Sequence, residues 1–334
     1  MERITLAHGN GGKLTQNLIE EVIYHYCGNE ILLQQDDAAY LPSLEEGRLV
    51  TSTDSFVVDP LFFPGGDIGK LAICGTVNDL AVNGAKPLYL TLALILEEGF
   101  ALKKLVKIIK SAAQIAEKIG VKIVAGDTKV VPQGKGGGVY INTTGFGILR
   151  PTVEPPNAQL KSGDKIIVSG SLGNHGAAIL ASQEGFEITG DLVSDCAPLN
   201  SLSASLLNAE VEIKLLTDPT RGGVAQALYE VVQYYQYNIE LKEKLIPLRR
   251  EVESLGEILG IDPLYLANEG RLLAIVAAED AKAVSNIMAE SGLGAGAAVI
   301  GEVQKGAGRV YLKTEFGGRR ILAGLAEQLL PRIC

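Results

Sequence analysis

The strongest constraint on the fold is a pattern of strand-length and helix-length apolar segments that occurs twice, on either side of a proline-rich segment. The first half ends in a predicted strand at 139–149, and the second begins with a predicted strand at 165–169. The intervening residues 151–157 contain three prolines, which interrupt helices and central strands and therefore indicate a linker. Neither half has a short repeat, and the chain has 334 residues, so the pattern predicts two α/β domains of mixed sheet and helix layers. The expected divisions are 1–150, 151–318 and a C-terminal segment at 319–334.

The composition limits the partners and the compartment. Hydrophobic residues make up 47% of the chain and charged residues 21%, so it can bury large cores and is not of the disordered class. A net charge of −9 argues against nucleic acid as the main partner, because binding phosphates needs a concentrated basic surface. The apolar runs, such as 88–96, are too short to span a membrane, and no signal-peptide pattern precedes the loop at 8–13. The four cysteines are far apart, which favours neither a zinc site nor a disulfide framework and fits the cytoplasm.

Three helices are predicted in enough detail to be tested. Residues 67–82 are rich in small side chains, which predicts a helix packed closely against a sheet or a second subunit, with Cys74 buried as a small hydrophobic residue. Residues 100–119 have apolar side chains at spacings of three and four, as an amphipathic helix does. Residues 319–330 are interpreted as a helix that Pro331 ends.

A glycine-rich loop at 8–13, His-Gly-Asn-Gly-Gly-Lys, directly precedes another predicted helix. Glycines let a backbone approach a phosphate closely, and the N-terminus of a helix favours an anion. The spacing differs from that of a P-loop and no strand precedes it, so a plain flexible turn is the alternative.

Acidic residues occur at four places at or near the ends of apolar segments. In α/β folds, strand ends often carry the side chains that do chemistry, and carboxylates that converge there repel one another unless they share a cation. Mg²⁺ suits such a site because it prefers oxygen ligands and bridges carboxylates to nucleotide phosphates. Each residue taken singly could instead cap a helix or turn. The candidate magnesium ligands are Asp37, Asp54, Asp79 and Asp127.

Further single residues are candidates for binding or proton transfer. Lys129 follows the last of these carboxylates, where it could either move a proton or pair with a phosphate. Arg221 could hold a phosphate, and Asp218 is interpreted as a cap of the helix that follows. His175 and Glu269 lie in loops where each could face a ligand. The alternatives are a structural histidine and a solvated loop glutamate.

The chain ends in Cys334, three residues after Pro331. A thiol at the end of a movable tail can be loaded at one site and processed at another, which is what a covalent carrier requires. An exposed free thiol is otherwise a liability, because it is open to oxidation and exchange. The alternative is an incidental frayed terminus.

Nine short motifs spread over the chain carry a family resemblance. They are residues 6–12, 52–55, 59–66, 71–75, 126–131, 194–196, 218–223, 267–270 and 330–334. With these motifs the chain resembles the hydrogenase maturation factors HypE, which share a superfamily with aminoimidazole ribonucleotide synthetase and selenophosphate synthetase. The ending is the most specific motif, because the other branches share the ATP-binding pattern but lack a terminal carrier cysteine.

The resemblance implies two PurM-like domains, of which the first binds ATP and forms a homodimer through its sheet, followed by a mobile tail. It also implies an ATP-dependent carbamoyl dehydratase. The partner HypF would load a carbamoyl group from carbamoyl phosphate onto Cys334, and dehydration would convert that group into a thiocyanate. The cyano group would pass to iron held by the HypC–HypD complex, as a ligand of the [NiFe] hydrogenase centre.

The resemblance assigns roles to particular residues. Matched by motif, the four aspartates named above would bind Mg²⁺ and the phosphates of ATP. Lys129 and Glu269 would take the two amide protons, and Cys334 would carry the group that reacts. The remaining nucleotide-binding residues would be Gly9, Gly11, Gly12, Lys13, Asn78, Gly126, Thr128 and Arg221.

Two other functions are compatible with parts of this pattern. A synthetase of the same superfamily that acts on a free small molecule, as selenophosphate synthetase does, would keep full activity without the last four residues. The loop at 8–13 lacks the cysteine or selenocysteine expected of a selenophosphate synthetase. A non-catalytic nucleotide-binding adaptor would tolerate Cys334→Ser and would consume no ATP.

Overall fold

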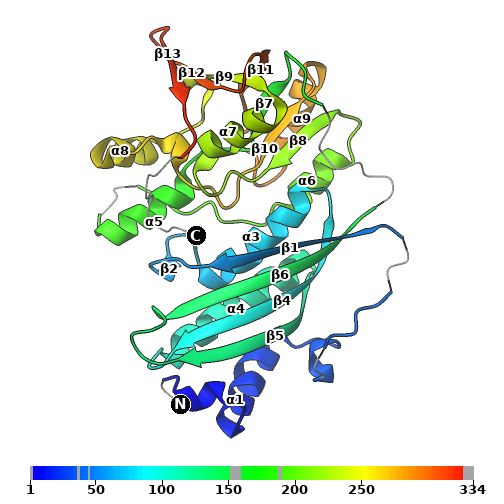
Figure 1. Ribbon diagram of the computed structural model, residues 1–334, viewed down its shortest axis with the longest axis vertical. Coiled ribbons are helices and arrows are strands. Elements are labelled where there is room, and N and C mark those ends of the chain that lie inside the picture. Colours follow the sequence, from blue (N-terminus) through cyan, green and yellow to red (C-terminus); the bar gives the residue numbers. More distant parts are fainter. Residues whose placement is uncertain (1–2, 36–37, 44–45, 151–158, 187–189, 326–334) are drawn as a thin grey trace.

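A four-stranded and a seven-stranded sheet form the two halves of the computed structural model, which describes residues 3–35, 38–43, 46–150, 159–186 and 190–325 (Figure 1). The strands of the first sheet end at Leu149, and those of the second begin at Lys165. The prediction of two α/β domains with mixed sheets is therefore confirmed. The predicted linker at 151–157 lies outside the described residues.

Each sheet contains one parallel pair of strands. The order of the first sheet is β1-β6-β4-β5, with β4 and β5 parallel, and that of the second is β13-β12-β9-β11-β7-β10-β8, with β12 and β9 parallel. Strands β2 and β3 form a separate hairpin. The strands are β1 (Arg48–Phe56), β2 (Phe62–Phe63), β3 (Gly66–Asp67), β4 (Lys86–Glu97), β5 (Lys122–Val131), β6 (Val139–Leu149), β7 (Lys165–Val168), β8 (Ile213–Thr217), β9 (Tyr237–Lys242), β10 (Leu273–Val276), β11 (Ala298–Lys305), β12 (Val310–Lys313) and β13 (Arg319–Leu322).

The helices cover the sheets and connect them. Among the described residues, no helix is both long enough and apolar enough to cross a membrane. The α-helices are α1 (Lys13–Leu18), α2 (His25–Cys27), α3 (Ile68–Val82), α4 (Leu102–Ile119), α5 (Asn174–Glu184), α6 (Asn200–Leu207), α7 (Gly223–Tyr235), α8 (Arg250–Leu259) and α9 (Ala281–Glu290). The π-helical segment η2 (Ile19–Tyr24) joins α1 to α2, and short 3₁₀ turns occur at η1 (Leu6–Gly9), η3 (Leu32–Gln34), η4 (Glu243–Leu245), η5 (Pro263–Tyr265) and η6 (Ala278–Asp280).

Two of the three helix predictions are confirmed, and the third is wrong where it can be compared. Helices α3 and α4 occupy the predicted segments, and Cys74 is fully buried. Residues 319–322 form strand β13 instead of a helix, and residues 326–330 lie outside the described part of the chain. Strand β13 pairs with β12 from Val310↔Leu322 to Lys313↔Arg319. Strand β13 forms a hairpin with the preceding strand β12 through residues 314–318, which include Gly317 and Gly318, and this pairing overrides the local apolar spacing.

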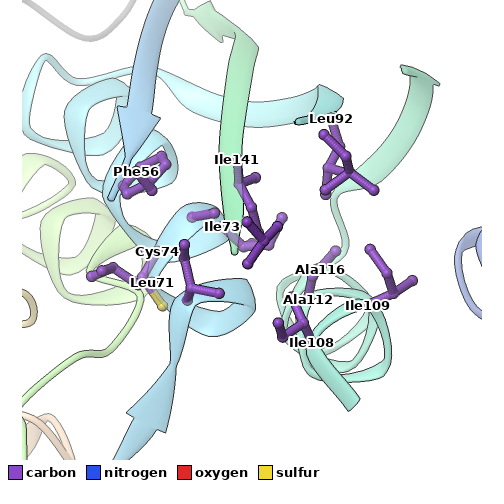
Figure 2. Close-up of a cluster of buried hydrophobic side chains, with 14 of the residues drawn as sticks. Phe56, Leu71, Ile73, Cys74, Leu92, Ile108, Ile109, Ala112, Ala116 and Ile141 are labelled. Atoms are coloured by element: carbon purple, nitrogen blue, oxygen red, sulfur yellow. The ribbon is translucent and has the colours of Figure 1, made fainter. Parts of the chain in front are cut away.

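Helix α3 lies at the centre of the molecule because one side of it packs on the first sheet while another contacts the second half. In the core of the first half, Leu71 and Ile73 of α3 pack with Ile108 of α4 and Ile141 of β6 (Figure 2). On the side toward the second half, Ser203 of α6 donates a hydrogen bond from Oγ to the carbonyl oxygen of Ala81, at 2.5 Å. The small side chains of α3 permit this close packing in more than one direction.

We expect Gly69→Ala to destabilise the protein, because a Cβ at this position would lie 2.2 Å from the carbonyl oxygen of Ile108. The two helices would have to move apart, at a cost of roughly 1–3 kcal/mol. The free energy of unfolding in urea measures this cost. The matched control is Gly292→Ala, since a Cβ there meets no atom within 4 Å. Equal stabilities of the two variants would contradict the close contact of α3 with α4.

Candidate active site

The first sheet separates the predicted site residues into two groups. Asp54 of β1 shares a row across the sheet with Leu92 and Gly126, and Asp127 belongs to the next row. Since neighbouring side chains on a strand point to opposite faces, Asp54 faces α3, whereas Asp127 and Lys129 face the other side. In one chain, Lys129 and Glu269 therefore do not meet.

The first group lines a cavity of about 200 Å³ between the two halves. Strand β1 and helix α3 contribute residues from the first half, and the loops that follow β8 and precede β10 contribute residues from the second. We refer to it as the interdomain cavity. Its lining residues are Asp54, Ser55, Phe56, Gly75, Asp79, Asp218, Thr220, Arg221 and Glu269.

Asp54 and Asp79 form the part of this cavity that belongs to the first half. Burial, and then the nearby Asp79 carboxylate, raise the pKa of Asp54 to about 6, while the positive charge of Arg221 acts in the opposite direction. Burial also raises the pKa of Asp79, against the effect of a 2.6 Å hydrogen bond from Ser52 Oγ to its Oδ2. The Asp79 carboxylate thus makes the ionisation of Asp54 harder, as expected of carboxyl groups that lie close together.

Asp218 is a third aspartate of the cavity, and its interpretation as a helix cap is wrong. Helix α7 begins at Gly223 and has Gly222 as its N-cap. The Oδ2 atom of Asp218 is buried without a hydrogen-bond partner among the described residues. Burial and the charge of Asp79 raise the pKa of Asp218 well above its ordinary value. Its place directly after strand β8 was the sequence signal that pointed to a role in the site.

Glu269 is only 2% exposed, so it is not a solvated loop glutamate. Burial, with smaller contributions from Cys196 and from neighbouring carboxylates, raises its pKa well above the ordinary value. Its backbone N–H donates a 3.0 Å hydrogen bond to Oδ1 of Asp195. Asp195 was named only as part of a motif, and its buried carboxylate supports the loop that carries Glu269. Burial raises the pKa of Asp195 to about 6, against the opposing charge of Arg271.

Asn78 was predicted to bind the nucleotide, and its position in the structure contradicts this. Its side chain is fully buried. Its Nδ2 donates to the carbonyl oxygen of Ala197 at 3.1 Å, and its Oδ1 accepts from the N–H of Leu199 at 2.7 Å. The amide is used to join α3 to the second half.

The second group of site residues lies beside strand β5. The glycine-rich loop packs against this strand, since a Cβ on Gly9 would lie 2.7 Å from the backbone nitrogen of Val130. Lys129 and Asp127 are exposed and form an ion pair at 3.2 Å. A pocket of about 240 Å³ opens along the strand, with Gly126, Asp127, Thr128 and Thr15 among its lining residues.

The remaining residues of the glycine-rich loop lead into helix α1, whose Thr15 lines this pocket. Gly12 is the N-cap of α1, and Lys13 is the first residue of that helix. The N–H of Gly11 donates to Oγ1 of Thr15 at 3.0 Å. The loop is therefore an ordered helix entry beside the pocket, which favours a binding role over a plain flexible turn.

The predicted magnesium site is not assembled within a single chain. Asp54 lies near the end of strand β1, as expected, whereas Asp127 lies in the middle of strand β5 and Asp79 in helix α3. Asp37 lies outside the described residues. Among the residues that are described, no group of three or more His, Cys, Asp or Glu side chains is arranged to hold a metal ion.

The last two predicted residues are His175 and Cys334. His175 is fully buried in α5, with Nδ1 2.8 Å from Oγ of Ser194 and its ring edge-to-face with Phe63. This supports the structural alternative for His175. Cys334 lies outside the described residues.

Comparison with known proteins gives matches over almost the whole chain. Residues 35–149 match the family described as AIR synthase related protein, N-terminal domain, and residues 161–313 match its C-terminal domain. A "Carbamoyl dehydratase HypE" of Rhodobacter capsulatus is 48% identical over 338 residues, which cover 100% of this chain and 98% of the relative.

Solved structures agree with the sequence matches. A hydrogenase maturation protein HypE in complex with ATP superposes with a TM-score of 0.93 at 42% identity, over 99% of each chain. The structure of a HypE–HypF complex matches with a TM-score of 0.80 at 44% identity, over 92% of this chain and 99% of the other.

We expect Asp54→Asn to stabilise the protein at neutral pH. The pKa of Asp54 rises from an ordinary value of about 3.9 to about 6 on folding, so its contribution to stability is lost as pH rises through that interval. The variant should therefore melt a few degrees higher than the wild type at pH 7.5 and at nearly the same temperature at pH 4. Differential scanning calorimetry without nucleotide or Mg²⁺ measures both. The exposed Asp191→Asn serves as the control, and a gain that is equal at both pH values would contradict the electrostatic origin.

Proposed function

The chain belongs to the carbamoyl dehydratase HypE family of ATP-binding hydrogenase maturation enzymes, and we propose that it dehydrates an S-carbamoyl group on its own Cys334 with the consumption of ATP. The carbamoyl oxygen leaves with the phosphoryl group as phosphate, and two protons leave the nitrogen. A thiocyanate remains on the sulfur and supplies the cyano ligand for the iron of a [NiFe] hydrogenase. The observation that carries the proposal is the buried Glu269, which faces three aspartates in the interdomain cavity.

The interdomain cavity suits a magnesium-bound nucleotide. The unpartnered Oδ2 of Asp218 and the raised pKa values of Asp54 and Asp79 are what is expected of carboxylates that need a cation. Mg²⁺ is commonly held by one or two carboxylates together with phosphates and water, so a complete set of protein ligands is not required. Asp54 and Asp79 would hold the ion, and Arg221 would bind phosphate. The nucleotide would supply the phosphoryl group that makes the carbamoyl oxygen a good leaving group.

Glu269 is suited to take a proton from the amide nitrogen. With its pKa raised well above the ordinary value, its carboxylate is a stronger base than a solvated glutamate. It must lose its own proton before it can accept one from the substrate. The acid limb of the pH–rate profile should therefore lie above the usual range of a glutamate.

Lys129 can act on the same nitrogen only if it comes from a second copy of the chain. The first sheet separates Lys129 from Glu269 within one chain, and proton transfer requires contact at hydrogen-bond distance. We therefore propose a homodimer in which the loop at 8–13 and Lys129 of one copy complete the cavity of the other. The open face of the sheet supports this, since Leu49 is 56% and Ile95 43% exposed there. Among the described residues, its edge strands β1 and β5 each pair with another strand of the sheet on one side only.

The proposed partners follow from the chemistry of loading and delivery. The solved complex of a similar HypE with HypF supports a HypF-type carbamoyltransferase as the enzyme that loads Cys334. A HypC–HypD complex that receives the cyano group, a cytoplasmic location and a domain boundary near residue 150 are further parts of the proposal. Cys334 would be loaded at the HypF-type partner and would react in the cavity.

We expect Glu269→Gln to stop dehydration while leaving the loading of Cys334 intact. Peptide mass spectrometry would follow Cys334 after incubation with the HypF-type partner, carbamoyl phosphate and Mg-ATP. The wild type should gain a carbamoyl group and then become lighter by one water, whereas the variant should keep the carbamoyl group, with a rate lower by about 10²-fold or more. Glu257→Gln, on helix α8, is the control. An unmodified Cys334 with ATP still hydrolysed would contradict the proposal and favour a synthetase of a free small molecule.

Mixing two inactive variants tests the shared site. Lys129→Ala and Glu269→Gln should each be inactive alone. If Lys129 serves the cavity of the other copy, a mixed dimer contains one site with both native residues, so activity should return on mixing. A mixture that stays inactive, with exchange of subunits verified by native mass spectrometry, would show that the two residues do not act in one site across the dimer.

A further inference from the structure

We infer that Asn78 is a positioning residue that holds Glu269 in place across the boundary between the two halves. This inference rests on the proposed function, in which Glu269 is a base. It assigns to Asn78 a role in the geometry of the reaction and no contact with the nucleotide.

The hydrogen bonds of Asn78 leave it little capacity for a ligand. Its Nδ2 lies 3.1 Å from the carbonyl oxygen of Ala197 and 3.4 Å from that of Glu269, and its Oδ1 accepts from the N–H of Leu199 at 2.7 Å. A side-chain amide has two donor hydrogens and one acceptor oxygen, and each of these functions is engaged here. The side chain is fully buried, so a nucleotide has no access to it.

Asn78 and Asp79 leave helix α3 in different directions. Successive residues of an α-helix are about 100° apart around its axis. Asp79 accordingly lines the interdomain cavity, while Asn78 reaches the second half. Two adjacent residues of one rigid helix thus set the position of a carboxylate on one side and that of the loop carrying Glu269 on the other.

Hydrogen bonds hold both the backbone N–H and the backbone carbonyl of Glu269. Its N–H donates to Asp195 Oδ1 at 3.0 Å, and its carbonyl oxygen accepts from the N–H of Ala197 at 3.2 Å and from Asn78. The next residue, Gly270, packs directly on the backbone of Asp195: a Cβ added to Gly270 would lie 1.9 Å from the carbonyl oxygen of Asp195. This close packing also restrains the loop. Among the hydrogen bonds of the described residues, the one from Asn78 is the link between this peptide and the first half. Its loss would free Glu269 to move relative to Asp54 and Asp79.

General docking of the two halves is a separate effect, and the chain offers a matched control for it. Ser203 also crosses the boundary, with a buried hydrogen bond from Oγ to the carbonyl oxygen of Ala81 at 2.5 Å. It has no hydrogen bond to Glu269 in the described part of the chain. Ser203→Ala therefore weakens the contact between the halves without touching the peptide that carries the base.

The test compares Asn78→Ala, Ser203→Ala and the wild type in the full dehydration assay with the HypF-type partner. ATP affinity, the dehydration rate at saturating ATP and its pH profile are measured for each. Rates are expressed per molecule that binds ATP, so partial unfolding does not imitate a catalytic defect. For Asn78→Ala we expect a rate lower by about 10-fold to 10²-fold and a shifted acid limb, with ATP affinity unchanged, because a displacement of about 1 Å is costly in catalysis. Ser203→Ala should match the wild type in rate and profile.

Two outcomes would overturn the inference alone. A weaker ATP affinity of Asn78→Ala with a normal rate at saturating ATP would make Asn78 a nucleotide ligand. Equal rates and profiles for Asn78→Ala and Ser203→Ala would reduce its role to docking. Retained dehydration in Glu269→Gln is a different result, since it would refute the proposed base and, with it, the positioning role.

Discussion

The candidate site depends on the buried contact between helix α3 and the second half of the chain. The amide of Asn78 and the hydroxyl of Ser203 make hydrogen bonds across this boundary, in surroundings from which water is excluded. Leaving these polar groups buried without a hydrogen bond would cost free energy, which favours the one arrangement of the two halves in which they are paired. The interdomain cavity exists only in that arrangement, because each half supplies part of its lining. Formation of the site therefore requires that the two halves dock.

The cavity gathers negative charge at a cost to stability. Burial raises the pKa values of Asp54, Asp79, Asp218 and Glu269, which means that folding makes their ionisation harder. Such strain is common at functional sites, since a ligand that supplies positive charge can relieve it. The same carboxylates would then favour a metal-bound nucleotide, and their charge would strengthen Glu269 as a base.

The first sheet serves both as a scaffold and as a partition. Its inner face packs on α3 and α4 (Figure 1). By the strand register, Asp54 belongs to this inner face, whereas Asp127 and Lys129 belong to the open face. A site that needs residues from both faces cannot close within one chain, because a sheet is a continuous layer of backbone. The predicted site residues therefore form two groups within one chain, and the proposed homodimer would bring the two groups together.

The sequence by itself determined the two α/β halves, the helices at 68–82 and 102–119 and the motifs that identify the family, because local apolar periodicity and short motifs do not depend on distant contacts. It also named Asp54, Asp79, Arg221 and Glu269, which the fold brings to one cavity. Only the tertiary structure decided the face on which each carboxylate lies, since that depends on the register between strands. It also gave Asn78 a partner in a loop almost 200 residues away. Such contacts depend on the folding of the whole chain, and no local pattern encodes them.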